Sequence, residues 1–254
     1  MKYSLTIDCG NSSTKMAVWA GDRVVDSIVM ASPSIGEVES FIGRHDIDAA
    51  ITGTVVGDIR AINRVLRLRN IPMAKVDCGL ELPIVIEYET PETLGADRIA
   101  AAVGAYEIAR RDGLTERYSD ILIADIGTAA TYDRISCDGK FKGGNIAPGL
   151  GMRLQALNKF TAALPKIESR GETPLWGKTT ETAMRAGAFN GIVAEIIYHH
   201  SLLGTPAVFL TGGWAETLAQ SLPFEARIEP DLVSYGLKIV LDKLLVDSVA
   251  DIHK

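Results

Sequence analysis

The sequence predicts an α/β fold that contains two related halves. Apolar segments that alternate like strands are followed, along the whole chain, by segments with helical spacing of apolar residues. Two passages, LTIDCGNSST and LIADIGTAAT, each place Asp-x-Gly and small hydroxylated residues after a strand. Their aspartates, Asp8 and Asp125, lie about half the chain apart. This internal repeat predicts two βα halves that face each other, with a ligand in the crevice between them.

Length and composition narrow the class of protein. The chain has 254 residues, enough for one large domain or two small ones. Hydrophobic residues make up 47% and charged residues 23%, which excludes disordered, collagen-like and disulfide-scaffold proteins. The net charge of -6 disfavours nucleic acid as a partner. An acidic protein that binds an anion must do so through local backbone N–H groups, a few cationic side chains or a metal. The three cysteines form no CxxC motif and the four histidines show no metal-ligand spacing, which disfavours a zinc site.

No apolar run approaches the roughly 18 residues that span a bilayer. The N-terminal residues also lack the apolar region of a signal peptide. We therefore expect a cytoplasmic protein without a membrane partner.

The first half is expected to cover residues 1–115. Its pattern predicts strands over residues 2–8, 15–19 and 23–29, the last two joined by a hairpin turn at Gly21 and Asp22. It then predicts a helix over 37–44, a strand over 49–54, and helices over 58–68 and 91–111.

The second half is expected to cover residues 116–254, after a polar stretch at 113–120. Its pattern predicts a buried strand over 121–124, a turn-rich loop over 143–149, helices over 150–160 and 179–199, a strand over 207–210 and a closing helix over 235–248. Gly187 and Gly191 lie four residues apart on the second of these helices, which predicts that another helix packs closely there.

The first candidate site follows the first strand. It comprises Asp8, Cys9, Gly10, Asn11, Ser12, Ser13, Thr14 and Lys15. Such a turn offers N–H groups and hydroxyls to phosphates, with Lys15 as a point charge, and Asp8 can hold Mg²⁺ directly or through water. A hairpin turn capped by the aspartate explains the same residues equally well.

Two further turns in the second half suit a nucleotide. Asp125-Ile126-Gly127-Thr128 repeats the first turn, and two phosphate loops at matching strand ends predict a nucleotide clamp. Gly212 and Gly213 follow another apolar strand, where their missing side chains allow close approach to adenosine. A plain strand-to-helix turn is an alternative explanation for this pair.

A third candidate site is Gly95-Ala96-Asp97-Arg98 at the start of a predicted helix. A helix N-terminus attracts anions, and the Arg98 guanidinium suits a carboxylate. Asp97 can accept a hydroxyl proton. In isolation, these residues are also explained by a capping aspartate beside a solvated arginine.

Taken together, the motifs DxGNSxxK, GADR, DIGTAAT, GGNIAPGL, GKTTETAM and LTGG resemble type III pantothenate kinases, in the order of that family. The resemblance runs from Asp8 to Gly213. It implies a duplicated ribonuclease-H-like fold of the actin, Hsp70 and sugar kinase superfamily, with a nucleotide cleft. It also implies a homodimer and ATP-dependent phosphorylation of pantothenate, the first step of coenzyme A synthesis.

The resemblance also implies roles for single residues. Asp8 to Lys15 correspond to the ATP phosphate loop, Asp97 to the general base, and Thr128 to an ATP contact. Pantothenate contacts are implied at Tyr88, Gly95, Ala96, Asp97, Arg98 and Thr180. Mg²⁺ is implied beside Asp8, and a monovalent cation, K⁺ or NH₄⁺, at Asp125. The chain departs from the family pattern at Ser12, which replaces threonine and keeps the hydroxyl, and at Ala130, which loses one.

Three other functions share parts of these motifs. Another small-molecule kinase of the superfamily has the same phosphate turns, and GADR distinguishes the present chain from it. The regulatory Bvg accessory factors share the family's motifs, although the intact acidic residues favour activity and the net negative charge disfavours DNA contact. An Hsp70-like chaperone fragment is disfavoured because the chain has no room for a peptide-binding domain.

Overall fold

The computed structural model describes residues 3–53 and 59–252, with side chains described up to residue 246. By its internal contacts the chain forms two compact units. The first comprises residues 1–108, 139–141 and 231–254, and the second comprises residues 109–138 and 142–230. The two sequence halves, 1–115 and 116–254, follow the repeat instead, and their boundary stays a prediction.

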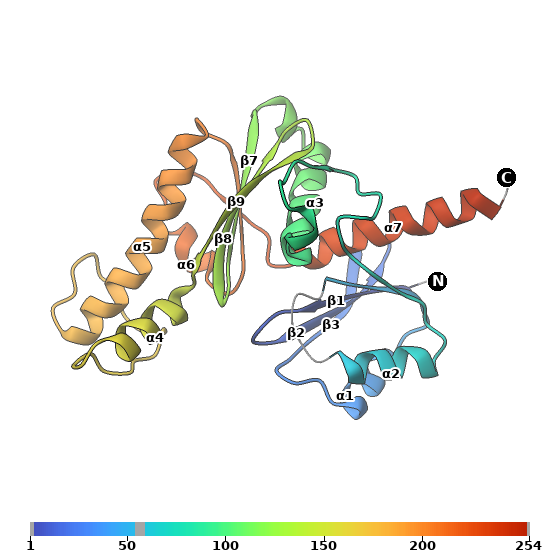
Figure 1. The fold of residues 1–254 in the computed structure, drawn as a ribbon, viewed down its shortest axis with the longest axis horizontal. Coiled ribbons are helices and arrows are strands. Elements are labelled where there is room, and N and C mark those ends of the chain that lie inside the picture. The colour runs from blue at the N-terminus through green and yellow to red at the C-terminus, as the bar shows by residue number, and fades with distance from the viewer. Residues whose placement is uncertain (1–2, 54–58, 253–254) are drawn as a thin grey trace. The chain divides into compact units, whose positions relative to one another are not determined.

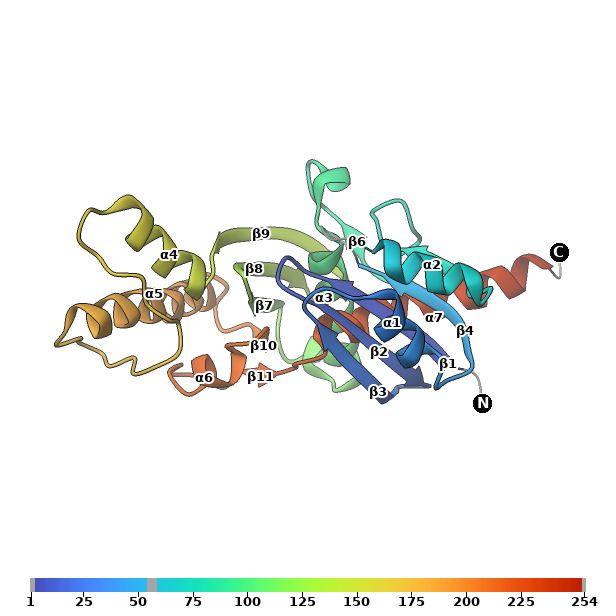
Figure 2. The ribbon, with the colours of Figure 1, turned by 90° about the horizontal axis from the view of Figure 1, so that it is seen from below.

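The first unit is built on a five-stranded sheet in the order β3-β2-β1-β4-β5. Its strands are β1 (Tyr3–Cys9), β2 (Thr14–Ala20), β3 (Arg23–Met30), β4 (Ile47–Thr52) and β5 (Met73–Lys75). The first three strands are antiparallel neighbours, whereas β4 lies parallel to β1 and β5 parallel to β4 (Figure 2).

Helices cover both faces of this sheet (Figure 1). On one face, α1 (Ile35–Ile42) and α2 (Arg60–Leu68) bury Phe41 and Ile62 against Leu5 and Ile7 of β1. On the other face lies α7 (Leu232–Ile252), where Tyr235 meets the ring of Trp19 with centroids 6.0 Å apart. The Trp19 indole N–H donates to the hydroxyl of buried Thr6 at 2.9 Å, so this polar pair is satisfied within the core.

The second unit repeats the same strand topology. Its sheet has the order β11-β10-β7-β8-β9, and the strands are β7 (Asp120–Ile126), β8 (Ala129–Ser136), β9 (Lys140–Pro148), β10 (Ala207–Thr211) and β11 (Arg227–Ile228). As in the first unit, an antiparallel hairpin is followed by a strand parallel to its first member. β9 enters this unit from the first, where β6 (Val85–Ile86) pairs with Lys140 and Phe141.

Two antiparallel helices cover one face of the second sheet. They are α4 (Leu150–Phe160) and α5 (Thr180–Leu202), which lie side by side in Figures 1 and 2. Leu154 of α4 and Phe189 and Ile192 of α5 pack on Leu122 and Ala124 of β7. The short helix α6 (Ala215–Ala219) follows β10 and adds Leu218 to this core.

Most predicted elements are present, with shifted ends. The helix predicted over 91–111 begins instead with a 3₁₀ turn (Pro91–Thr93), and α3 (Ala96–Arg111) follows. Thr54 and Asp58, at the ends of a predicted strand and helix, lie outside the described residues. Among the described residues, no helix has the length and apolar character needed to cross a bilayer.

The turn-rich loop predicted over 143–149 is wrong, because most of it belongs to strand β9. Gly143 and Gly144, which suggested a loop, are instead required by the backbone conformation and close contacts of this strand. A Cβ on Gly144 would collide with the backbone and carboxylate of Asp133, so the strand needs glycine there. Gly143 adopts φ +102°, which is a conformation that favours glycine within a strand.

Helices α3 and α7 touch through their backbones at two glycines of the first unit. A Cβ on Gly104 would lie 2.6 Å from the Leu232 carbonyl oxygen, and one on Gly236 would collide with the Ala100 carbonyl. We therefore expect Gly236→Ala to lower the free energy of unfolding by about 1–3 kcal/mol, the usual cost of overpacking. Denaturant unfolding followed by circular dichroism measures this change.

Gly36→Ala is the matched control for this substitution. Gly36 is an exposed residue of α1, and a Cβ there meets nothing within 4 Å. Helix propensity alone then predicts a gain of up to about 1 kcal/mol. Equal effects at the two positions would contradict the close contact at Gly236.

Candidate functional site

The first predicted phosphate loop joins β1 to β2 in the first unit. The Gly10 N–H donates to the Ser13 carbonyl at 3.0 Å, which closes a tight turn whose residues Gly10, Asn11 and Ser12 are exposed. Cys9 differs from them, because its side chain is only 1% exposed and belongs to the apolar core. The loop therefore presents backbone and short polar groups to solvent, while Cys9 acts as a core residue.

Asp8 and Lys15 lie opposite each other where this hairpin begins. They are paired in the β1–β2 register, with Cys9 and buried Thr14 as the next pair. The Lys15 ammonium also forms an ion pair of 2.5 Å with Asp231, just before α7. Burial and the nearby charge of Asp97 raise the pKa of Asp8 to about 6, although Lys15 acts in the opposite direction.

Asp97 occupies the first turn of α3. Its carboxylate oxygen Oδ1 accepts the Arg98 backbone N–H at 2.9 Å, which fixes the side chain across the helix N-terminus. Gly95 precedes this turn, and a Cβ there would collide with the same carboxylate oxygen. Glycine at position 95 is therefore required for Asp97 to fold back over the helix start.

Arg98 is nearly buried, with 6% of its surface exposed. Its guanidinium lies 5.6 Å from the ring centres of both Tyr88 and Phe141, and these two rings contact each other edge to face. The rings hold the cation by cation–π attraction and limit its conformations. The first unit therefore brings together Tyr88 and Arg98, two of the predicted pantothenate contacts, and Ala96 is buried beside them.

The second predicted phosphate loop lies between β7 and β8 in the second unit. The Gly127 N–H donates to the Ala129 carbonyl at 2.9 Å, while Gly127 and Thr128 are exposed. Gly149, at the start of α4, donates its N–H to the Thr128 carbonyl at 3.1 Å. Ala130 is fully buried in the apolar cluster of this unit, so the missing hydroxyl at this position faces the core.

Gly212 reaches the same loop from the end of β10. It adopts φ +84°, and a Cβ there would lie 2.5 Å from the Ile126 carbonyl oxygen and 2.6 Å from Oδ1 of Asp125. Thr211 and Asp125 are paired in the strand register, so the two strand ends meet at this glycine. Gly213 is exposed, whereas Trp214 packs partly into the apolar cluster.

The predicted contact Thr180 is the exposed first residue of α5. The Thr179 side chain caps this helix by accepting the Thr182 backbone N–H, and the Thr182 side chain accepts the Thr179 backbone N–H in turn. Thr180 belongs to the second unit, whereas Tyr88, Asp97 and Arg98 belong to the first. Neither unit by itself therefore assembles the full predicted pantothenate set.

No cluster of three or more acidic, histidine or cysteine side chains able to hold a metal occurs among the described residues. Asp8, whose partly buried carboxylate lies near the end of β1, is the residue predicted to hold Mg²⁺. Asp125 offers a carboxylate beside the backbone of Gly212 and Ile126, oxygen donors that suit a hard cation.

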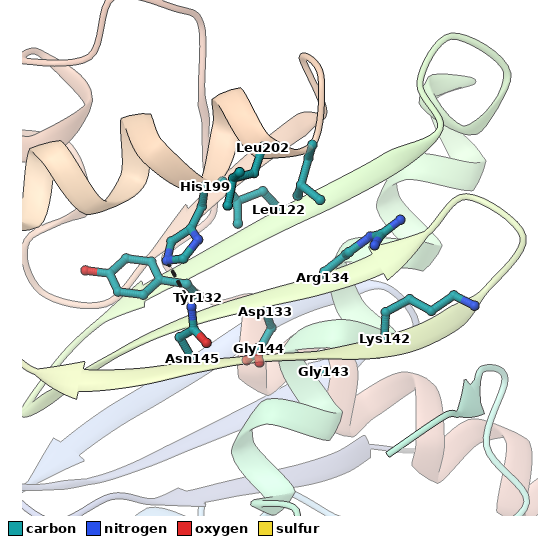
Figure 3. A pocket seen from close by; sticks show the side chains of 11 residues that line it. Leu122, Tyr132, Asp133, Arg134, Lys142, Gly143, Gly144, Asn145, His199 and Leu202 are labelled. Atoms are coloured by element: carbon teal, nitrogen blue, oxygen red, sulfur yellow. Dashed lines mark hydrogen bonds between the residues drawn. The ribbon is translucent and has the colours of Figure 1, made fainter. Parts of the chain in front are cut away.

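The second unit also has hollows that contain none of the predicted site residues. One of them, of about 190 Å³, lies between β8, β9 and the end of α5 (Figure 3). His199 and Asn145 are 3.3 Å apart there, and Arg134 forms an ion pair with Asp120. Another, of about 590 Å³, is an apolar groove between α4 and α5 lined by Leu157, Phe160 and Met184.

The two repeats, each with an aspartate and a glycine turn after its first strand, give the chain a duplicated α/β fold of the kind found in sugar kinases. Solved structures show the same fold. A Baf family protein from Campylobacter jejuni aligns with a TM-score of 0.62 and 21% identity, covering 94% of this chain and 98% of that one. A ROK hexokinase from Thermus thermophilus aligns with a TM-score of 0.50 and 12% identity, covering 94% and 98%.

The chain belongs to the type III pantothenate kinase family, whose model matches residues 4–200. A type III pantothenate kinase of Bacteroides fragilis is 37% identical over 94% of this chain and 97% of its own length. One from Porphyromonas gingivalis is 35% identical over 95% of this chain and 99% of its own length. The predicted family and fold class are confirmed.

Three residues around the site were missed by the sequence reasoning. Phe141 completes the ring contacts of Arg98, Asp231 pairs with Lys15, and Gly149 holds the second loop. Only Gly149 carried a sequence signal, because it ends a glycine-rich motif. Phe141 and Asp231 are distant in sequence from the residues that they contact, so local patterns do not reveal them.

The raised pKa of Asp8 predicts a stability cost that Asp8→Asn removes. The pKa of Asp8 is about 6 in the folded state and about 4 in the unfolded chain. The protonated carboxyl group therefore stabilises the fold at low pH. This contribution to the free energy of unfolding is lost as the pH rises from about 4 through about 6. We expect Asp8→Asn to be about 1–3 kcal/mol more stable than the parent chain at pH 7.5. Denaturant unfolding at pH 7.5 and pH 4.5 measures the difference.

The pH dependence is the internal control for this prediction. At pH 4.5 Asp8 is mostly protonated, so the advantage of the asparagine variant should shrink. A variant that is less stable at both pH values, or equally advantaged at both, would contradict the assigned pKa.

Proposed function

We propose that the chain transfers the γ-phosphoryl group of ATP to the primary hydroxyl of pantothenate, the first step of coenzyme A synthesis. Membership of the type III pantothenate kinase family carries this conclusion. The closeness of Asp8 and Asp97 within the first unit supports it, because phosphoryl transfer places a metal-bound phosphate beside an acceptor hydroxyl. In this proposal the metal-bound phosphate lies beside Asp8 and the acceptor hydroxyl lies beside Asp97.

Asp97 is the proposed general base. Its carboxylate is held at the start of α3 by the Arg98 N–H, which donates to Oδ1. The hydroxyl oxygen would bond to the γ-phosphorus while the bond from that phosphorus to the ADP oxygen breaks. The hydroxyl proton would move to the Asp97 carboxylate late in this loose transition state, and ADP would leave. The Arg98 guanidinium and Tyr88 would orient pantothenate, together with Gly95, Ala96 and Thr180.

The first loop, from Asp8 to Lys15, is the proposed site of the ATP phosphates, and Thr128, Gly212 and Gly213 are proposed to contact the nucleotide from the second unit. Lys15 would neutralise phosphate charge after exchanging its contact with Asp231. Asp8 would hold Mg²⁺ directly or through water. When bound with ATP, Mg²⁺ supplies charge neutralisation on the phosphate oxygens.

A monovalent cation, K⁺ or NH₄⁺, is proposed at Asp125. The close approach of Gly212 to the Asp125 carboxylate and the Ile126 carbonyl supports this, since one oxygen from each lies near the same point. The cation supplies positive charge next to the phosphate loop of an acidic protein.

We further propose that the active form is a cytoplasmic homodimer, and that neither nucleic acid nor membrane is a partner. A regulatory protein that binds ATP or pantothenate without turnover, like the Bvg accessory factors, is the alternative. A coupled assay of ADP release with ATP, Mg²⁺ and pantothenate decides between them. Turnover that requires pantothenate supports the kinase, whereas nucleotide binding without turnover supports the regulator.

Asp97→Asn tests the general base. Since general-base help is typically worth about 10²–10⁴-fold, we expect kcat to fall by about that factor while the KM for ATP changes little. The same substitution at exposed Asp48 on β4 is the matched control and should leave both constants unchanged. A near-normal kcat for Asp97→Asn would remove the assignment.

Asp125→Ala tests the monovalent cation site. We expect the variant to lose most of the rate increase that K⁺ gives over Na⁺ at constant ionic strength, because the carboxylate that binds the cation is gone. The measurement is the initial rate across a K⁺ titration, with Asp48→Ala as the control. An unchanged titration would place the cation elsewhere.

A further inference from the structure

An arginine, a glutamate and a tyrosine from three elements of the second unit form one hydrogen-bonded network. The Arg153 atom Nη2 on α4 donates to both carboxylate oxygens of Glu195 on α5, at 2.8 and 2.6 Å. The Tyr132 hydroxyl on β8 donates to the same carboxylate at 2.6 Å. The network therefore ties both helices to the sheet strand that follows the second phosphate loop.

The same arginine also holds the backbone next to that loop. Its Nε donates to the Pro148 carbonyl at 2.8 Å, at the end of β9. The next residue, Gly149, donates its N–H to the Thr128 carbonyl, and its Cα lies so close to Gly127 and Thr128 that no Cβ fits. A path of direct contacts therefore runs from Glu195 through Arg153 and Pro148 to the loop backbone.

Gly191 makes room for the arginine on α5. A Cβ at this position would lie 2.9 Å from Nη1 of Arg153. Gly187, by contrast, has nothing within 4 Å of the position of a Cβ. The glycine pair that predicted close helix packing is therefore explained at position 191 by the passage of a guanidinium.

We propose that Arg153 and Glu195 are positioning residues for the second phosphate loop, and that they set the affinity for ATP without touching it. The inference rests on the proposed function, in which Thr128 and its neighbours contact the nucleotide. Exposed loop N–H groups bind phosphates best when their geometry is fixed beforehand. The Gly127–Thr128 backbone obtains that geometry from Gly149, whose own position depends on the arginine.

The shape of the arginine side chain matters to this role. A planar guanidinium can donate through Nε to a carbonyl and through Nη2 to a carboxylate in one fixed orientation, which a lysine ammonium cannot reproduce. Tyr132 adds to the rigidity. Burial and the Glu195 carboxylate raise its pKa, so its hydroxyl stays protonated and remains a donor. Figure 3 shows its ring beside His199, with the hydroxyl directed away from that pocket.

Three variants test the proposal in different ways. Arg153→Lys keeps the positive charge but removes the guanidinium, which donates in two directions. Glu195→Gln removes the negative charge that pairs with Arg153. Gly191→Ala keeps every polar group but displaces the Arg153 guanidinium. Changes along such a network typically alter coupling by about 3- to 30-fold. We expect each variant to raise the KM for ATP within that range, while the KM for pantothenate and the unfolding midpoint change little.

Arg134→Lys is the matched control. Arg134 lies on the same strand as Tyr132 and forms an ion pair with Asp120 of 2.7 Å, and in Figure 3 its side chain extends away from the Tyr132 ring. Its substitution should leave the KM for ATP unchanged. The double variant Arg153→Lys with Glu195→Gln should be no weaker than the worse single variant, because both disturb one unit.

A binding measurement separates this proposal from the proposed reaction. Calorimetric titration with a non-hydrolysable ATP analogue reports the affinity for nucleotide even without turnover. If the parent chain binds the analogue and the three variants bind it equally well, the positioning role is overturned. If the parent chain binds the analogue but never phosphorylates pantothenate, the proposed reaction fails while weaker binding by the variants still supports the positioning role. A parent chain that does not bind the analogue overturns both.

Discussion

The partly buried Asp8 carboxylate, near the end of the central strand β1, is a charge that its neighbours in the first unit must accommodate. Burial and Asp97 raise the pKa of Asp8, so its charged form lowers the stability of the fold near neutral pH. The surrounding structure limits that cost. β2 places Lys15 directly opposite Asp8, and the start of α7 supplies Asp231 to orient the lysine. Residues from both ends of the chain therefore serve one carboxylate.

The second unit repeats the strand topology but treats its own aspartate differently. Asp125 also ends the first strand of a repeat, yet its neighbours are the backbone of β10 and Gly212 rather than a lysine across a hairpin. The hairpin position that follows is an apolar one, since Ala130 is fully buried. One topology thus provides two chemically distinct loops, one flanked by the charged side chains of Asp8 and Lys15 and one shaped mainly by backbone contacts.

The sequence predicted the repeat, the family and the residues at each strand end, because these signals are local or recur at fixed order. It misread residues 143–149 as a loop, since glycines required by a neighbouring strand look the same as glycines required by a turn. It also missed Phe141, which joins Tyr88 and Arg98 only once β9 has paired with β6. Contacts of this kind depend on tertiary pairing between distant segments, and no spacing rule records them.

The second loop, around Gly127 and Thr128, is organised by its main chain. Its shape depends on contacts of the main chain with Gly149 and Gly212, where a methyl group would not fit, and not on a hydroxyl at Ala130. Such contacts transmit any displacement of the strand ends directly to the loop, because there is no flexible side chain between them. The rigidity of the loop must then come from the layer behind it, where Arg153 joins the β9 terminus to α5 and, through Glu195, to β8. The loop backbone is therefore tied to α5 and β8 through Arg153 and Glu195, although neither side chain is part of the loop.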